Sequence, residues 1–277
     1  MKDLEGMKKR ILDEYERLGV DDTFSFSCHP GISCFNNCCG DVNIVLTPYD
    51  ILRLKNRLGI TSTEFISKYT VRPFTEDQQL PVVLFKMQDD KENKPCHFVS
   101  GPGCGVYEDR PWPCRMYPVG EASARTEKDP DAPQFYFIMK EDRCDGLAEA
   151  KKWTIGEWME NQGVAPYDAM GELLRDINLH PYFKRGGNLR PQQMEMYFTA
   201  LYDLDKFRAF IFESSFLKRY KVEDELLDKL REDDVELLKF GHEWLHTCLF
   251  NEKRIPLHED TLDKHKQRVE EQRVKKD

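Results

Sequence analysis

The feature that most constrains this chain is a group of cysteines between positions 28 and 39. The segment reads CHPGISCFNNCC and holds four of the nine cysteines, two of them adjacent. A second segment, CHFVSGPGCGVYEDRPWPC, adds Cys96, Cys104 and Cys114, and Cys144 follows on its own. Thiols gathered in this way are typical of a site that binds a soft metal. The fold of the first half must therefore bring these segments together.

Metal binding explains these cysteines better than disulfides do. A chain of 277 residues can bury a core without covalent cross-links. Its N-terminus reads as a charged amphipathic helix rather than a signal peptide, and no apolar run approaches the roughly 20 residues of a membrane helix. We therefore expect a cytoplasmic protein with reduced thiols and no membrane partner. In that compartment dense cysteines are more often metal-binding or catalytic, and an odd number cannot all pair.

The charge of the chain limits its partners. A net charge of -9, from 41 basic and 50 acidic residues, disfavours duplex nucleic acid, which binds to a clustered positive surface. The basic residues are in excess only in the tail, DKHKQRVEEQRVKK, where acids interrupt them. This pattern is typical of a solvated helix or a frayed end. We expect the partner to be another protein.

The pattern of apolar and turn-forming residues predicts an α+β fold. An irregular cysteine-rich region with short strands and helices should precede an all-helical layer. We expect a cysteine-cluster metal-binding region over 1–150, a helical region packed on it over 151–250, and a charged tail over 251–277. The Gly, Pro, Ser and Asn residues of the cysteine segments suit a backbone that wraps around a small centre.

Individual elements follow from periodicity and capping residues. A helix is predicted over 4–18 and ended by Gly19. Capping boxes predict helices over 47–58 and 61–69. Strands are predicted over 42–46, 81–87 and 134–139. In the second half, helices are predicted over 154–163, 166–178, 191–212 and 222–250.

The number of thiols bounds the kind of site. Four thiolates complete either a tetrahedral zinc site or an iron–sulfur cubane. Eight thiols make two such sites, or one site with four spare. No cysteine pair has the two-residue spacing of a zinc ribbon, and the three-then-two spacing of a radical-SAM cluster is absent. Because adjacent residues of an extended segment point to opposite sides, Cys38 and Cys39 either serve two centres, or one is a ligand and the other packs as a buried thiol.

Several segments together resemble a known family. The adjacent cysteines precede a TPYD helix start, then CGVYEDRPWPCRMYP, then Cys144 before a glycine and a TIGEW helix. This order resembles the YkgJ-type cysteine-cluster family, described as zinc- or iron-chelating proteins, over about residues 24–165. The most specific part of the resemblance is Tyr107, Arg110, Pro111, Cys114, Arg115 and Pro118.

The resemblance implies a set of ligands. These are Cys34, Cys38, Cys39, Cys96, Cys104, Cys114 and Cys144. We add Cys28 to the predicted metal ligands, although five residues separate it from Cys34 where the family pattern is usually tighter. The cofactor is then an iron–sulfur cluster or zinc, and the sequence identifies no catalytic residue.

Three functions fit a chain of this kind. The first is a metalloprotein whose centre supports electron transfer, metal handling or maturation of another protein. The second is a protein-modifying enzyme that uses the cluster, because a flagellin lysine methylase is similar to this family. The third is a structural zinc module that presents the helical half to a partner. No adenosylmethionine-binding glycine loop follows a predicted strand, which favours the first.

Other candidate ligands have weaker support. His29 and His97 each adjoin a cysteine, but a histidine in that position is as often an exposed neighbour as a ligand. Residues 242–246 spell HExxH, which on a helix places His242 and His246 on one face with Glu243 as general base. A metalloprotease needs a third ligand downstream. Its candidates, Glu259 and His265, have no support from spacing.

A simpler interpretation of residues 242–246 is an amphipathic helix that buries Trp244 and Leu245. Cys248 lies at helical spacing from Trp244 and is predicted to be a core residue rather than a ligand. Arg110 and Arg115 bracket the turn RPWPC beside a predicted thiolate. We expect them to offset its charge and orient the sulfur, the alternative being two surface arginines.

Overall fold

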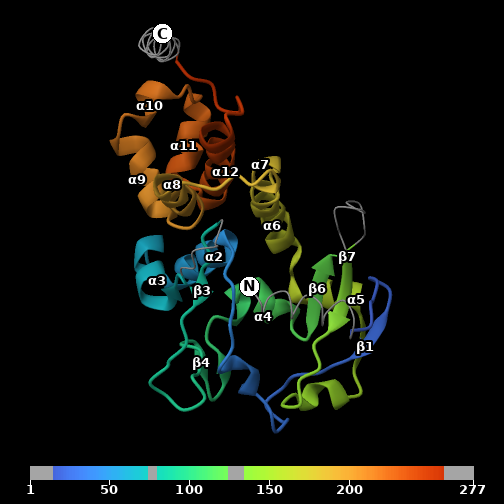
Figure 1. Ribbon diagram of the computed structural model, residues 1–277. Coiled ribbons are helices and arrows are strands. Elements are labelled where there is room, and N and C mark those ends of the chain that lie inside the picture. The colour runs from blue at the N-terminus through green and yellow to red at the C-terminus, as the bar shows by residue number, and fades with distance from the viewer. Residues whose placement is uncertain (1–14, 74–79, 124–133, 259–277) are drawn as a thin grey trace. The chain divides into compact units, whose positions relative to one another are not determined.

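The computed structural model describes residues 15–73, 80–123 and 134–258. The chain divides into two compact units (Figure 1). The first takes its residues from Met1–Leu46 and Leu84–Ala169, and the second from Thr47–Val83 and Met170–Asp277. Each unit is therefore assembled from segments that are far apart in the sequence.

Short antiparallel strand pairs form the framework of the first unit. β1 (Thr23–Ser25) pairs with β8 (Lys152–Thr154), and β4 (Val99–Ser100) pairs with β5 (Gly103–Cys104). β6 (Val119–Ser123) and β7 (Gln134–Ile138) form a longer hairpin, in which Val119 lies opposite Ile138 (Figure 1). In this unit, β3 (Leu84–Phe85) makes a single bridge from Leu84 to Val45.

Short helices connect these strands. They are η1 (Asn37–Cys39), η2 (Tyr107–Asp109), α4 (Trp112–Met116), η3 (Asp145–Ala148) and α5 (Ile155–Gln162). α5 starts at a capping box in which the Thr154 N–H donates to Glu157 Oε2 at 2.8 Å. It ends at Gly163, whose φ of 61° lies in the left-handed region that favours glycine. α6 (Ala165–Asn178) follows and continues into the second unit.

The core of the first unit joins the strands to α4 and α5. Trp158 of α5 packs edge-on against Phe26, with ring centroids 5.3 Å apart, and its indole N–H donates to the Met116 carbonyl at 3.0 Å. Met116 ends α4, so this contact fixes the helix that carries Cys114. The buried core residues are Phe24, Phe26, Met116, Val119, Ile155, Trp158 and Val164.

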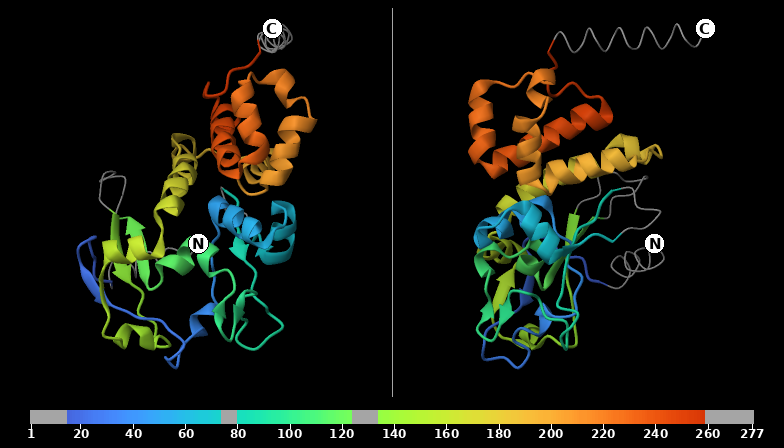
Figure 2. Two further views of the ribbon diagram at one scale, coloured as in Figure 1. Left: turned by 180° about the vertical axis from the view of Figure 1, so that it is seen from behind. Right: turned by 90° about the vertical axis from the view of Figure 1, so that its left-hand side faces the viewer.

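The second unit is helical. Its first helices are α2 (Pro48–Leu58) and α3 (Ser62–Tyr69), with capping boxes at Thr47 and Thr61, and the short β2 (Thr70–Val71) follows. The later helices are α7 (Pro181–Lys184), α8 (Pro191–Leu201), α9 (Leu204–Glu213), α10 (Phe216–Arg219), α11 (Asp224–Glu232) and α12 (Asp234–Phe250) (Figure 2). No helix among the described residues combines the length and apolarity needed to cross a membrane.

α12 is the central helix of this unit. It buries Leu237, Leu245 and Trp244, and it packs closely on α8. At the crossing, a Cβ on Gly241 would lie 2.5 Å from the Ala200 carbonyl oxygen. The two helices therefore need glycine at this position.

A buried ion-pair network ties α2 to the later helices. Lys55 has a side chain only 7% exposed, and its Nζ lies 2.6 Å from Asp234 Oδ2 and 3.5 Å from Asp205 Oδ2. Arg208 reaches the same two carboxylates. Asp205 also accepts from the Ser62 N–H of α3 at 2.6 Å. Four segments are thus held by shared carboxylates.

The predicted fold class is confirmed, since helices dominate the second half and short sheets lie in the first. The predicted helices over 47–58 and 61–69 are confirmed, as is the strand over 134–139. The two longest predicted helices are each divided: 191–212 breaks between α8 and α9, and 222–250 breaks between α11 and α12.

Three of the predicted elements are wrong or incomplete. Residues 15–18 are not helical, and Leu18 instead bridges Tyr136; the rest of the predicted 4–18 helix lies outside the described residues. The predicted strand over 42–46 is reduced to a bridge at Val45, and that over 81–87 is reduced to β3. These apolar runs pack without a long neighbouring strand to pair with.

Candidate metal centre

The first cysteine segment folds into consecutive tight turns. Hydrogen bonds between residues three apart, such as Cys34 C=O to the Asn37 N–H at 2.9 Å, follow one another from His29 to Cys39. Asn36 has a φ of 72°, a conformation that asparagine tolerates better than most residues. Its side-chain amide donates to the Ser100 carbonyl at 2.9 Å, which attaches this loop to the second cysteine segment.

Backbone contacts align the two segments. The Cys96 N–H donates to the Cys39 carbonyl at 2.7 Å, and Gly40 bridges Pro95. A Cβ on Gly40 would lie 2.5 Å from the Asn93 carbonyl oxygen, so only glycine allows this approach. Cys39 and Cys96 are thereby held side by side.

The thiols act on one another in two sets. Burial raises the pKa of Cys28 to about 11, and the neighbouring charges of Cys38, Cys34 and Cys144 contribute to that rise. Cys39 instead has Cys114 and Cys96 as electrostatic neighbours besides Cys38, and Cys96 has Cys104. We define set A as Cys28, Cys34, Cys38 and Cys144, and set B as Cys39, Cys96, Cys104 and Cys114.

Cys38 and Cys39 lie where the two sets meet. The Cys39 thiol donates a hydrogen bond to Cys38, which lowers the pKa of Cys38 to about 7 and raises the pKa of Cys39. The positive charge of Arg143 also lowers the pKa of Cys38. The thiol and thiolate forms of Cys38 are therefore comparably populated near neutral pH.

Polar groups around the sulfurs suit thiolates. The Asp145 N–H donates to Cys34 Sγ at 3.2 Å, and the Phe98 N–H donates to Cys96 Sγ at 3.5 Å. The buried Tyr117 hydroxyl has no partner at ordinary hydrogen-bond geometry among the described residues. Burial and then the neighbouring Cys144 raise the pKa of Tyr117, so the hydroxyl remains a donor that faces a thiol. N–H and O–H donors of this kind stabilise metal-bound sulfur, and the donor set fits zinc or iron.

Each set also has an arginine nearby. Arg143 donates to the Gly40 carbonyl at 3.1 Å beside Cys38. Burial lowers the pKa of Arg110, while the charges of Cys104 and Cys114 act to raise it, which places this guanidinium near set B. Arg110 and Arg115 are both 7% exposed, so the surface alternative is wrong for both.

Arg115 does not have the environment expected of a residue that orients a thiolate. Arg115 donates to the carbonyls of Gln162 at 2.6 Å, Arg110 at 3.1 Å and Glu108. These bonds occupy its guanidinium with backbone acceptors. Arg110 also donates to the Tyr107 carbonyl and to Gln162 Oε1, but it differs in having Cys104 and Cys114 as electrostatic neighbours. Arg110 therefore fits the predicted role beside a thiolate, and Arg115 holds backbone segments of this unit together.

None of the nine cysteines, all of which lie in the described residues, forms a disulfide, and their exposure differs. Cys28 of set A and Cys114 of set B are exposed, whereas the other six members are partly buried. Cys248 lies in α12, where burial raises its pKa to about 12. It belongs to the second unit, whereas both sets belong to the first.

Residues 27–150 match the model of the family CxxCxxCC, described as "Putative zinc- or iron-chelating domain". This segment is similar to that family. No curated protein and no solved structure matches the chain.

The CxxCxxCC domain contains every member of both thiol sets, as well as Arg110, Tyr117 and Arg143. The family resemblance noted in the sequence is therefore confirmed, and it supports metal binding by this segment. The eight cysteines stay predicted ligands. His29, by contrast, is exposed and accepts from the Gly31 N–H at 3.1 Å, with Glu149 3.6 Å from its other nitrogen. His97 is also exposed.

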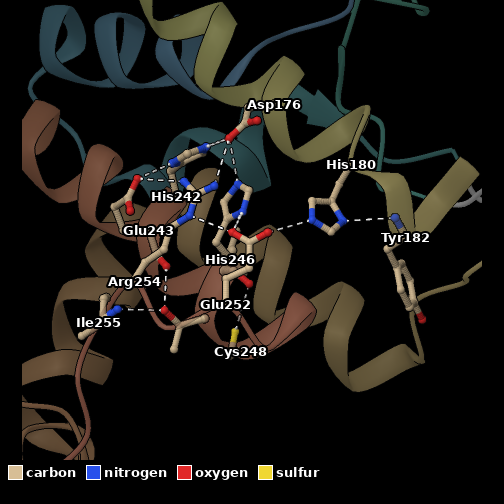
Figure 3. A network of polar contacts seen from close by, with 12 residues as sticks. Asp176, His180, Tyr182, His242, Glu243, His246, Cys248, Glu252, Arg254 and Ile255 are labelled. Atoms are coloured by element: carbon tan, nitrogen blue, oxygen red, sulfur yellow. Dashed lines mark hydrogen bonds and ion pairs between the residues drawn. The ribbon is translucent and has the colours of Figure 1, made fainter.

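The HExxH residues lie outside the CxxCxxCC domain, in α12. Trp244 and Leu245 are buried as predicted, yet His242 and His246 are buried as well, at 3% and 0% exposure. Both histidines face Asp176 of α6 (Figure 3). The third potential ligand is thus Asp176, which precedes the HExxH residues in the sequence. The predicted downstream candidates, Glu259 and His265, lie outside the described residues.

Among the described residues, two groups bring three potential ligand atoms within 4.8 Å of one another, and neither contains a cysteine. One is Asp176, His242 and His246, and the other is His180, His246 and Glu252. A hydrogen bond with His180, aided by Arg254 and His246, lowers the pKa of Glu252 to about 2. Sequence reasoning missed Asp176 and His180 because nothing in their spacing relates them to α12.

Proposed function

We propose that the CxxCxxCC domain holds iron or zinc at two four-thiolate centres, set A and set B, and hands the metal to another protein. The observation that carries the proposal is that Cys38 and Cys39, whose thiols share a hydrogen bond, otherwise have different thiol neighbours. These residues are adjacent in sequence, yet Cys38 interacts with Cys28 whereas Cys39 interacts with Cys96 and Cys114. One four-thiolate centre could not take all five of these thiols as ligands.

The donor count supports two centres. Each set supplies four thiols, which is the number that completes a tetrahedral zinc site or anchors one iron–sulfur cubane. Zinc with four thiolates carries two negative charges. Arg143 beside set A and Arg110 beside set B offset part of that charge.

Exposure supports a role in metal handling. One cysteine in each set is exposed, Cys28 in set A and Cys114 in set B, although partial burial still raises the pKa of the Cys28 thiol. A ligand from an acceptor protein can approach the metal at such an edge and replace the exposed thiol first. A purely structural zinc site is usually closed by buried ligands. A bound metal would cross-link the distant segments that supply the thiols of each set.

The test begins with metal analysis of the anaerobically purified protein. We expect two centres per chain. Cys28→Ser and Cys114→Ser should each remove one centre, and the double variant should remove both. Cys248→Ser is the matched control and should keep the parent content. One centre per chain, or a double variant no worse than either single one, would contradict the two-centre arrangement.

Release of the metal for transfer is tested with a competing chelator in excess. We expect metal to leave both centres much faster than the chain unfolds in urea. Release no faster than unfolding would rule out metal handling. Iron with sulfide and a visible band bleached by dithionite would assign electron transfer instead.

A further inference from the structure

The second unit contains a cluster of buried histidines that the thiol centres do not involve. His242 Nε2 lies 3.1 Å and His246 Nε2 lies 3.0 Å from the same atom, Asp176 Oδ2 (Figure 3). His242 and His246 are one helical turn apart on α12, and Asp176 belongs to α6. Two imidazoles and a carboxylate from two helices thus converge on one point.

One of these potential ligand atoms, Nε2 of His246, makes no hydrogen bond among the described residues. His246 is fully buried, and its Nε2 makes no hydrogen bond of acceptable geometry in the described residues despite its distance of 3.0 Å from Asp176. A buried nitrogen without a partner costs about 1–3 kcal/mol. A bound cation would satisfy it.

A carboxylate lies beside the other ring nitrogen, Nδ1, of each of the two imidazoles. His242 Nδ1 lies 3.0 Å from Glu243 Oε1, and His246 Nδ1 lies 2.9 Å from Glu252 Oε2. When Nδ1 carries the proton and donates it to a carboxylate, Nε2 is left with a free lone pair. A carboxylate behind a histidine is the usual support of a metal-binding imidazole.

The charge of the cluster also favours a cation. Asp176, Glu243 and Glu252 provide three carboxylates. Arg254 contacts all of them, at 3.6, 3.2 and 2.9 Å. With neutral imidazoles, one arginine leaves two negative charges. A divalent ion would balance them.

We propose that Asp176, His242 and His246 bind a divalent transition metal ion such as Zn²⁺, at a site separate from the thiol centres. Two imidazoles and one carboxylate are a ligand set typical of zinc with an open fourth position. The Asp176 side chain is 52% exposed, so solvent reaches the site on the side of its carboxylate ligand.

The same geometry argues against a metalloprotease of the type that HExxH suggests. In that mechanism the glutamate must reach a metal-bound water. Here Glu243 Oε1 is held by His242 Nδ1 at 3.0 Å and by Arg254 at 3.2 Å. Glu243 therefore positions a ligand, and the motif provides a metal site without its usual general base.

The test uses the full chain, loaded with Zn²⁺ and desalted. Asp176→Asn and His242→Ala should each bind one equivalent of zinc less than the parent. Glu172→Gln is the matched control, because Glu172 also lies on α6 and pairs only with Arg175 in the contacts described. It should bind as much zinc as the parent. Parent-level zinc in both Asp176→Asn and His242→Ala would overturn the proposal.

Co²⁺ distinguishes this site from the thiols. Thiolate-to-cobalt charge-transfer bands arise only from the cysteine centres, so Asp176→Asn should keep them while it loses one equivalent of bound cobalt. A loss of zinc accompanied by weaker thiolate bands would place the missing metal at the thiols and overturn the assignment. Asp176 is exposed, so Asp176→Asn decides the question if His242→Ala does not fold.

Discussion

Replacing the two arginines that flank RPWPC should produce two different defects. Arg115 donates to three backbone carbonyls and lies over the Tyr167 ring, 4.6 Å from its centroid. A hydrogen bond to a charged group contributes about 1.5–3 kcal/mol. Glutamine can keep one of the three bonds, so Arg115→Gln should lose two. The expected loss is roughly 3–6 kcal/mol of the free energy of unfolding, a large part of a typical total of about 5–15 kcal/mol.

Arg110→Gln should instead weaken metal binding. Its guanidinium is an electrostatic neighbour of Cys104 and Cys114, and loss of a group that supports metal ligands typically costs about 10–100-fold in affinity. Arg110→Lys retains the charge and is the matched control. It should recover most of the affinity.

Both effects can be measured on metal-saturated protein. Urea unfolding monitored by tryptophan fluorescence reports stability, and competition with a chelator reports affinity. We expect Arg115→Gln to lower the urea midpoint and keep the parent affinity. Arg110→Gln should lower the affinity, and it should lower the midpoint as well because Arg110 is buried and donates to the Tyr107 carbonyl and to Gln162. If Arg115→Gln unfolds at the parent midpoint, or Arg110→Gln keeps the parent affinity, the assigned roles are wrong.

Four further predictions concern stability. Because a structural metal can supply about 10 kcal/mol of folding energy, removing it with a chelator should expose residues 28–46 and 84–144 to protease while the second unit resists; uniform resistance would refute this. Lys55→Met should lower the free energy of unfolding by about 3 kcal/mol, since it leaves buried carboxylates short of a cation, and urea titration checks it. Burial acts to raise the pKa of Asp234, but hydrogen bonds from Lys55 and Arg208 lower it overall. The stabilisation of the fold by the Asp234 carboxylate should be complete above its unfolded pKa of about 3.9 and should be lost as the pH falls through its lower folded pKa. A urea midpoint independent of pH between about 2 and about 5 would contradict this. Cys248→Ser should cost at most about 3 kcal/mol and leave the metal content unchanged, as elemental analysis will show.

Local signals predicted local structure well. The helices after Thr47 and Thr61 begin where their capping boxes indicated, because a cap is made by residues three apart. The break inside 222–250 was missed, although Asp233 marks it by accepting from the N–H groups of Val235 and Glu236. Apolar periodicity continues across this break because the helices on both sides bury residues in the same unit.

Non-local relations were less predictable. The cysteine types indicated a metal, and the adjacent pair suggested two centres. Which thiols meet depends on contacts such as that between Cys96 N–H and the Cys39 carbonyl, which no spacing encodes. Asp176 was missed for the same reason, since 66 residues separate it from His242.

The discontinuous second unit has a consequence for synthesis on the ribosome. α2 and α3 emerge early, yet Lys55 finds Asp234 only after nearly the whole chain has been made. Until then a lysine destined for burial and the apolar faces of two helices have no final partners. Domains generally fold as units, so this one cannot be completed during translation of its own first segment. Nascent chains that stop before α12 should be the species that chaperones retain.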